Sequence, residues 1–236
     1  MKISFSPEIS PAEQTCILQS NLWNTWLKKA SAEFVISEVH FASVDFRKRD
    51  NNKEIKNPLF IKLKATATDK EGKPQHGVCV LRGDAVGVLV VLECENEKYL
   101  LLVEQPRFPL GERRFLEIPA GILDWSNDPL KIAIAELKEE AQIDAAADEL
   151  KLLTPEPIAA SCGLLDEKIY LYAITRTVSN EELAKMNNRA QEYTAEEEWI
   201  ETKIIPFSSA RNQITDSKSL SALYLYLSMT TQQSKT

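Results

Sequence analysis

The sequence predicts an α/β (α+β) fold: a sandwich of helices around a mixed sheet, preceded by a small antiparallel sheet. One observation is that strand-like and helix-like segments alternate after residue 81. A second is an amphipathic helix that begins after Asp128. A third is the alternation of apolar and polar residues over 33–80, which is typical of half-buried strands. We therefore expect residues 1–80 to form a helix and the small sheet, and residues 81–236 to form a main domain that ends in a helix.

Composition and charge limit the classes of protein to which the chain can belong. It has 236 residues, of which 44% are hydrophobic and 27% charged, as in ordinary soluble globular proteins. Its net charge of −7 disfavours non-specific binding of nucleic acid, because neutralising phosphates requires clustered Lys and Arg. The sequence shows neither a signal-peptide pattern nor an apolar run of about 18 residues, so no membrane span is expected. Widely spaced cysteines predict reduced thiols and a cytoplasmic protein: Cys16, Cys79, Cys94 and Cys162.

The first 80 residues predict one helix and several strands. Residues 11–29 carry apolar side chains at helical spacing, and we favour a helix packed on the body over a helix that binds a partner. Turn-forming clusters at 50–53 and 69–73 separate the strands that follow. The predicted strands are residues 34–36, 39–46, 59–67 and 77–81.

The main domain alternates strands and helices. A buried strand and its hairpin partner come first, and a short strand then leads through Pro119-Ala120-Gly121 to the central helix. A loop at 159–167 separates the two strands that follow this helix. The predicted strands are residues 85–92, 99–104, 114–118, 150–153, 168–175 and 199–207. The predicted helices are residues 129–141, 181–189 and 215–228.

The central helix has clear end signals and an apolar face. Asp128 is predicted as its N-cap and Pro129 as its first residue, where no amide donor is needed. Gln142 is predicted at its C-terminus, in a left-handed conformation that costs a non-glycine residue roughly 1 kcal/mol. The predicted apolar face consists of Leu130, Ala133, Ile134, Leu137 and Ala141.

Three glutamates form a second face of this helix. Glu136, Glu139 and Glu140 stand at positions i, i+3 and i+4, so their carboxylates share one patch. They repel one another unless a cation lies between them, and a hard divalent ion such as Mg²⁺ (or Mn²⁺) prefers oxygen ligands. The alternative is a solvated, Glu-rich helix face, and the helix by itself leaves both interpretations open.

Residues 121–143 resemble the Nudix box, a loop-helix pattern of Gly, five residues, Glu, seven residues and Arg-Glu-apolar-any-Glu-Glu-any-Gly-apolar. Six positions match in register: Gly121, Glu136, Leu137, Glu139, Glu140 and Ile143. Three depart, because Asn127 replaces the first Glu, Ala135 the Arg and Gln142 the second Gly. In the family the replaced Glu and Arg help to hold the loop and helix together. Their joint loss leaves no unpaired charge, and none of the departures removes an expected metal ligand.

Further segments resemble one branch of this family, the ADP-ribose and ADP-sugar pyrophosphatases. The likeness covers roughly residues 75–228, and a small N-terminal sheet accompanies it. Cys162 stands where the branch has Pro in its Ser-Pro-Gly loop. The matching segments are residues 81–86, 103–107, 116–121, 161–167 and 216–218.

The resemblance implies a role for each matching residue. Glu136 and Glu140 would be the main metal ligands, joined by the carbonyl of Ala120. Glu139 would share a second ion and belong, with Glu167, to the catalytic residues, since Glu167 would activate or orient water. The remaining assignments are Arg107 on the pyrophosphate, Arg82 near the nucleotide and Glu117 in support of the metal shell.

Each of these roles has an alternative. Arg107 and Arg82 are also compatible with surface ion pairs. Glu167 is also compatible with an ordinary loop carboxylate, and Asp166 competes for its role. Residues 160–167 are expected to close on the substrate with Gly163 as the hinge.

The implied function is metal-dependent hydrolysis of a nucleoside diphosphate sugar to a nucleoside monophosphate and a sugar phosphate. Dinucleotides and coenzyme A derivatives are further candidate substrates. The alternative is a non-catalytic or weakly active nucleotide-binding module, which the three substituted box positions motivate. By resemblance we also expect a homodimer built by the N-terminal sheet.

Overall fold

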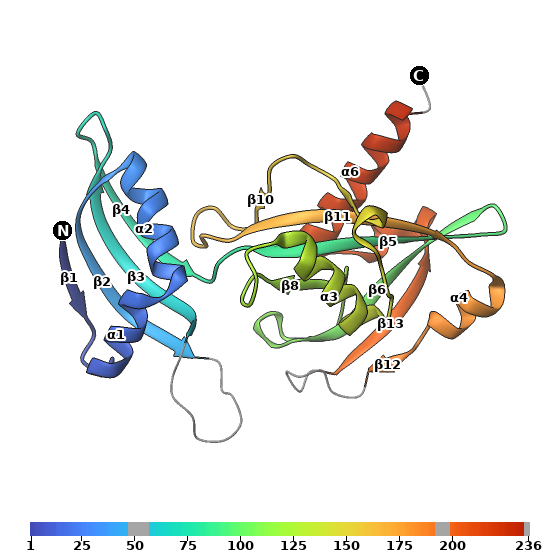
Figure 1. Cartoon of the computed structure of the whole chain (residues 1–236), viewed down its shortest axis with the longest axis horizontal. Helices are drawn as coiled ribbons and strands as arrows, with labels where there is room; N and C mark the ends of the chain where they lie inside the picture. Colours follow the sequence, from blue (N-terminus) through green and yellow to red (C-terminus); the bar gives the residue numbers. More distant parts are fainter. Residues whose placement is uncertain (47–56, 192–198, 234–236) are drawn as a thin grey trace. The chain divides into compact units, whose positions relative to one another are not determined.

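The computed structural model of the chain describes residues 1–46, 57–191 and 199–233 (Figure 1). The chain forms two units. The first comprises Met1–Gly83 together with Ser161–Glu167, and the second comprises Asp84–Ala160 together with Lys168–Thr236. The turn predicted at 50–53 lies outside the described residues.

A mixed sheet forms the centre of the first unit, whereas the sequence predicts a purely antiparallel one, because a parallel strand, β1, joins the antiparallel strands. Its strands lie in the order β1-β2-β3-β4, with β1 parallel to β2 and the other pairs antiparallel. The strands predicted at 34–36 and 39–46 are one strand, β2, whose register shifts between Ile36 and Glu38. A bulge of this kind breaks the apolar alternation without ending the strand, so the sequence pattern looks like two strands. The strands are β1 (Lys2–Phe5), β2 (Val35–Phe46), β3 (Pro58–Thr68) and β4 (Pro74–Leu81).

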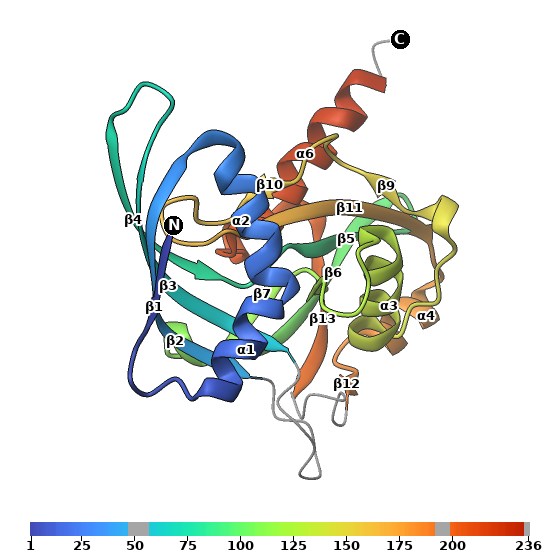
Figure 2. The same cartoon turned by 60° about the vertical axis from the view of Figure 1, so that its left-hand side comes forward.

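Two helices, α1 (Pro11–Gln19) and α2 (Asn21–Glu33), pack on this sheet (Figure 1, Figure 2). The single helix predicted at 11–29 is wrong, because the chain breaks at Ser20. The Ser20 hydroxyl donates to the Ile17 carbonyl at 2.7 Å and accepts from the Trp23 amide at 3.2 Å. One side chain therefore ends the first helix and caps the second. The packed arrangement that we favoured is confirmed: Ile17 and Trp23 are buried against β2 and β3.

A second mixed sheet forms the centre of the second unit. Its main path runs β10-β11-β5-β6-β13-β12, with β11 parallel to β5 and the other pairs antiparallel. Three short strands add to it, since β7 pairs with β6, β8 with β5 and β9 with β11. The strands are β5 (Ala85–Cys94), β6 (Glu97–Arg107), β7 (Glu112–Glu117), β8 (Ala120–Ile122), β9 (Lys151–Leu152), β10 (Ile158–Ala159), β11 (Lys168–Thr177), β12 (Ala190–Gln191) and β13 (Ile200–Pro206).

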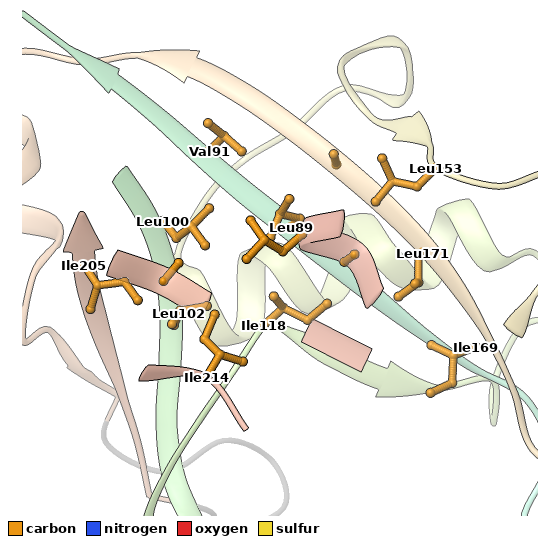
Figure 3. Close-up of a cluster of buried hydrophobic side chains, with 14 of the residues drawn as sticks. Leu89, Val91, Leu100, Leu102, Ile118, Leu153, Ile169, Leu171, Ile205 and Ile214 are labelled. Atoms are coloured by element: carbon orange, nitrogen blue, oxygen red, sulfur yellow. The ribbon is translucent and has the colours of Figure 1, made fainter. Parts of the chain in front are cut away.

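Helices cover both faces of this sheet, which confirms the predicted sandwich. Valines 86, 88 and 90 of β5 point toward α3 (Pro129–Ala141), whereas Leu89 and Val91 belong to the cluster that packs on α6 (Ser217–Gln233). Figure 3 shows this second cluster. Because successive strand residues face opposite sides, a strand buried on both faces is apolar throughout. The remaining helices are α4 (Asn180–Met186) and α5 (Ala210–Gln213), and single 3-10 turns occur at Phe108–Leu110, Ala147–Glu149 and Phe207–Ser209.

Among the described residues, no helix is long and apolar enough to cross a membrane.

Candidate active site

Helix α3 begins and ends where the sequence predicts. The Asp128 carboxylate accepts from the amides of Leu130 at 3.1 Å and Lys131 at 3.4 Å, which confirms the N-cap. Gln142 has φ 55° and ψ 36°, so it adopts the predicted left-handed conformation. Its side-chain oxygen accepts from Arg189 Nη1 at 2.9 Å.

The buried face of α3 differs in part from the prediction. Ile132, Ala133, Leu137 and Ala141 are buried, whereas Leu130 and Ile134 are half-buried. The prediction missed Ile132, and it placed Glu140 on a separate acidic face. Glu140 is instead only 6% exposed, although it is a glutamate. A buried carboxyl group requires a specific partner, because it loses the hydration that water provides.

The partner of Glu140 lies in the bend between β7 and β8, residues 118–120, whose last residue begins β8. The Ala120 amide donates to Glu140 Oε2 at 2.8 Å. Burial raises the pKa of Glu140 well above its ordinary value of 4.5, and this amide opposes the rise. The charges of Glu136 and Glu117 raise that pKa further, whereas Arg107 lowers it. A divalent cation would stabilise the ionised carboxylate in the same way as Arg107, but more strongly.

Gly121 is explained by the side chain of Glu136. A Cβ on Gly121 would lie 1.9 Å from Glu136 Oε1 and 2.6 Å from its Cγ, so no other residue fits without moving Glu136. The Glu136 carboxylate therefore lies against the backbone of β8, next to the amide that binds Glu140. The structure brings together Ala120, Glu136 and Glu140, and such oxygen donors are those that Mg²⁺ and Mn²⁺ prefer.

Glu139 is placed differently. It is exposed, and within the described residues no group of three or more His, Cys, Asp or Glu side chains is arranged to hold a metal ion. The predicted ligand roles of Glu136, Glu139, Glu140 and the Ala120 carbonyl therefore all stay predictions.

Arg107 lies in a cluster of charges next to this bend. Its Nε donates to Glu117 Oε1 at 2.5 Å, and Glu117 is only 2% exposed. Lys218 of α6 donates to the other oxygen, Glu117 Oε2. Sequence reasoning noted Lys218 only as part of the 216–218 likeness and assigned it no role.

The other two predicted site residues belong to the first unit and contact each other. Arg82 Nη1 lies 3.1 Å from Glu167 Oε1, and the Glu167 side chain is only 6% exposed. The Arg82 guanidinium also lies over the Phe60 ring, 5.9 Å from its centroid. Arg82 and Arg107 therefore both form ion pairs, as the alternative for them expects. Their roles toward substrate stay predictions.

The loop that carries Glu167 is attached to β4. The Val80 amide donates to the Leu164 carbonyl at 2.9 Å. Asp166 Oδ1 accepts from the amides of Arg82 at 2.8 Å and Gly83 at 3.3 Å, so Asp166 holds the loop backbone. A Cβ on Gly163 would meet no atom within 4 Å, so packing does not explain this glycine and its hinge role stays a prediction.

Comparisons with known proteins identify relatives of this chain. The model of the NUDIX domain matches residues 81–222. Nudix hydrolase 14, chloroplastic, of Arabidopsis thaliana is 29% identical over 242 residues, which cover 95% of this chain and 75% of that protein. The ADP-ribose pyrophosphatase of Bacillus subtilis is 29% identical over 155 residues, covering 63% of this chain and 77% of that protein.

A third relative and a solved structure extend the comparison. The methanol dehydrogenase activator of Bacillus methanolicus is 37% identical over 98 residues, which cover 42% of this chain and 50% of that protein. A crystal structure described as an ADP compounds hydrolase superposes with a TM-score of 0.56 at 14% identity, covering 86% of this chain and 97% of that one. At this identity the similarity shows the fold.

Proposed function

The chain belongs to the Nudix domain family and is a hydrolase of that family, and on this premise we propose that it cleaves the pyrophosphate bond of a nucleoside diphosphate sugar. The products would be a nucleoside monophosphate and a sugar phosphate. The observation that carries the proposal is the buried Glu140 carboxyl group, which binds the Ala120 amide beside Glu136. The ADP-ribose pyrophosphatase similarity favours ADP-ribose as the first substrate to test.

The metal-binding residues would be Glu136, Glu140 and the carbonyl of Ala120, with Glu139 serving a second ion. Bound Mg²⁺ or Mn²⁺ would neutralise the diphosphate and lower the pKa of the attacking water. Burial of Glu140 would strengthen its interaction with a cation, because the local dielectric is low. The Ala120 amide holds this carboxylate in place before any ion binds.

Three further residues complete the proposed reaction. Arg107 would bind the diphosphate through charge-assisted hydrogen bonds. Glu167 would accept a proton from the attacking water, and Arg82 would bind near the nucleotide. To do so, both Arg82 and Glu167 would exchange their mutual ion pair for contacts with substrate.

The test is hydrolysis of ADP-ribose, ADP-glucose and UDP-glucose by the pure protein with Mg²⁺ or Mn²⁺, from neutral to alkaline pH. We expect AMP or UMP to form with at least one substrate. We expect Glu140→Gln to abolish turnover while the protein stays folded, as circular dichroism would show. A parent protein that forms no product under any of these conditions would refute the proposal.

Two finer expectations belong to the same proposal. We expect a homodimer, which light scattering of the purified protein would detect, and a cytoplasmic location, which fractionation of the source cells would test. Asn127, Ala135 and Gln142 remove none of the proposed ligands, so they do not argue for a non-catalytic module. The division of the chain after residue 80 also stays a prediction.

A further inference from the structure

The buried carboxylate of Glu117 binds two cations, one on each oxygen. Arg107 Nε donates to Oε1 at 2.5 Å, and Lys218 Nζ donates to Oε2. The side chains of Glu117 and Lys218 are 2% and 15% exposed, whereas that of Arg107 is 35% exposed. Arg107 therefore extends from the buried Glu117 carboxylate toward solvent, and the less exposed Lys218 binds the other oxygen of that carboxylate.

The first turn of α6 holds Lys218 in place. Lys218 Nζ lies 3.1 Å from Asp216 Oδ2, and the same oxygen accepts from the amide and hydroxyl of Ser219, at 2.9 and 2.5 Å. The Ser219 hydroxyl in turn accepts from the Ile118 amide at 2.9 Å. The start of α6 is thus bound to two consecutive residues, Glu117 and Ile118, just before the Ala120 bend.

The position of Lys218 limits how Arg107 can bind Glu117. A guanidinium prefers a two-point contact in which two of its nitrogens bind both carboxylate oxygens. In the side-on form of that contact, Nε binds one oxygen and an Nη nitrogen binds the other. Arg107 Nε binds Oε1 and Lys218 Nζ binds Oε2, and the positive charge of Lys218 opposes the approach of a second cationic donor to Oε2. Without Lys218, Oε2 would lose its cation and the guanidinium would turn toward it.

We propose that Lys218 is a positioning residue of the hydrolase: through its contact and its charge at Glu117 Oε2, it fixes the carboxylate that holds the Arg107 guanidinium in the orientation that binds the substrate diphosphate. This inference rests on the proposed function, in which Arg107 binds the diphosphate. Lys218 itself touches no substrate and acts through Glu117.

The test is a double-mutant cycle with ADP-ribose as substrate. Lys218→Met keeps the aliphatic stem and removes the charge, and it should lower kcat/KM about tenfold, mainly through KM, because the diphosphate is bound in the ground state as well. Lys218→Arg keeps the charge and should restore most of the activity. In an Arg107→Met background, Lys218→Met should change kcat/KM by less than about twofold, because the residue through which it acts is gone.

Lys203→Met is the matched control. Lys203 has a similarly covered side chain, 24% exposed, and pairs with Glu201 at 2.9 Å on β13, outside the Glu117 cluster. The Lys203→Met substitution should leave KM unchanged. Thermal melts of every variant would report loss of folding, and Lys218→Gln, which retains an N–H donor, replaces Lys218→Met if the latter does not fold.

Two results would overturn the inference. One is a Lys218→Met protein whose KM equals that of the parent. The other is a Lys218→Met effect that is as large in the Arg107→Met background as in the parent. If the parent hydrolyses none of the substrates, the proposed function fails. Calorimetric binding of ADP-ribose in the presence of a chelator then tests the same cycle without turnover, with about tenfold weaker binding expected for Lys218→Met.

Discussion

At the scale of single residues, Gly121 and Glu136 depend on each other. We expect Gly121→Ala to push the Glu136 carboxylate from its place, because the new Cβ would lie 1.9 Å from Oε1. The side chain can rotate away, so the loss of stability should be small. The loss of kcat/KM should be about 10- to 100-fold, since misplacing a catalytic group by an ångström costs that much.

The control for this substitution is Gly77→Ala in β4. A Cβ there meets no atom within 4 Å, so both stability and kcat/KM should stay close to those of the parent. Equal effects of the two substitutions would contradict the role given to the Gly121 contact.

The buried Glu140 predicts a dependence of stability on pH. Its pKa is raised well above 4.5, mainly by burial, so the folded state holds this proton more tightly than the unfolded state does. The protonated Glu140 therefore stabilises the folded state fully below pH 4.5, and this stabilisation is lost as the pH rises through the raised pKa. The glutamine of Glu140→Gln cannot ionise. With a chelator present, the melting temperature of this variant relative to that of the parent should therefore rise between pH 4.5 and 8. A constant difference across this range would contradict the prediction.

At the scale of elements, the contacts that hold α3 and the bend together do not involve the substituted box residues Asn127, Ala135 and Gln142. The Glu140–Ala120 hydrogen bond and the Ser219–Ile118 hydrogen bond fix the bend from two sides. Restoring the family pair with Asn127→Glu and Ala135→Arg would add an ion pair worth about 0–1 kcal/mol. The gain in kcat/KM should therefore stay below about fivefold.

Steady-state kinetics of the double variant and of Ala135→Arg alone would check this. The single variant introduces a charge without its partner and should be no more active than the parent. A gain of tenfold or more in the double variant would mean that the bend is poorly held in the parent.

At the scale of the whole molecule, a segment far along the chain joins the first unit. Residues 161–167 attach to β4 through Asp166, which binds the Arg82 and Gly83 amides. Asp166→Ala would leave those amides without this acceptor, at a cost of about 1–3 kcal/mol. Hydrogen exchange of residues 161–167 should become about 10- to 100-fold faster, and kcat should fall because Glu167 loses its fixed position.

Asp69→Ala provides the comparison in the same unit. Asp69 also accepts from two amides, those of Glu71 and Lys73, but in a remote turn. The Asp69→Ala substitution should leave the hydrogen exchange of residues 161–167 unchanged. Unchanged exchange in Asp166→Ala as well would show that other contacts hold the loop.

Much of the fold was predictable because local patterns agree with it. The cap at Asp128, the left-handed Gln142 and the apolar run of β5 each follow from the chemistry of a few neighbouring residues. The break at Ser20 was missed because both flanking segments are helical and serine at a junction has no periodicity. The strand β1 was missed because four residues are too few to show an alternation.

The sequence by itself determined the family, the sandwich fold and the helix that carries Glu136, Glu139 and Glu140, because these depend on spacing along one chain segment. Only the tertiary structure decided that Glu140 is buried against Ala120, that Glu167 pairs with Arg82 and that Lys218 shares Glu117 with Arg107. The last two contacts join residues 85 and 101 positions apart, as their numbers show. Burial and ion pairing at such separations depend on how the strands and helices pack, which no local pattern encodes.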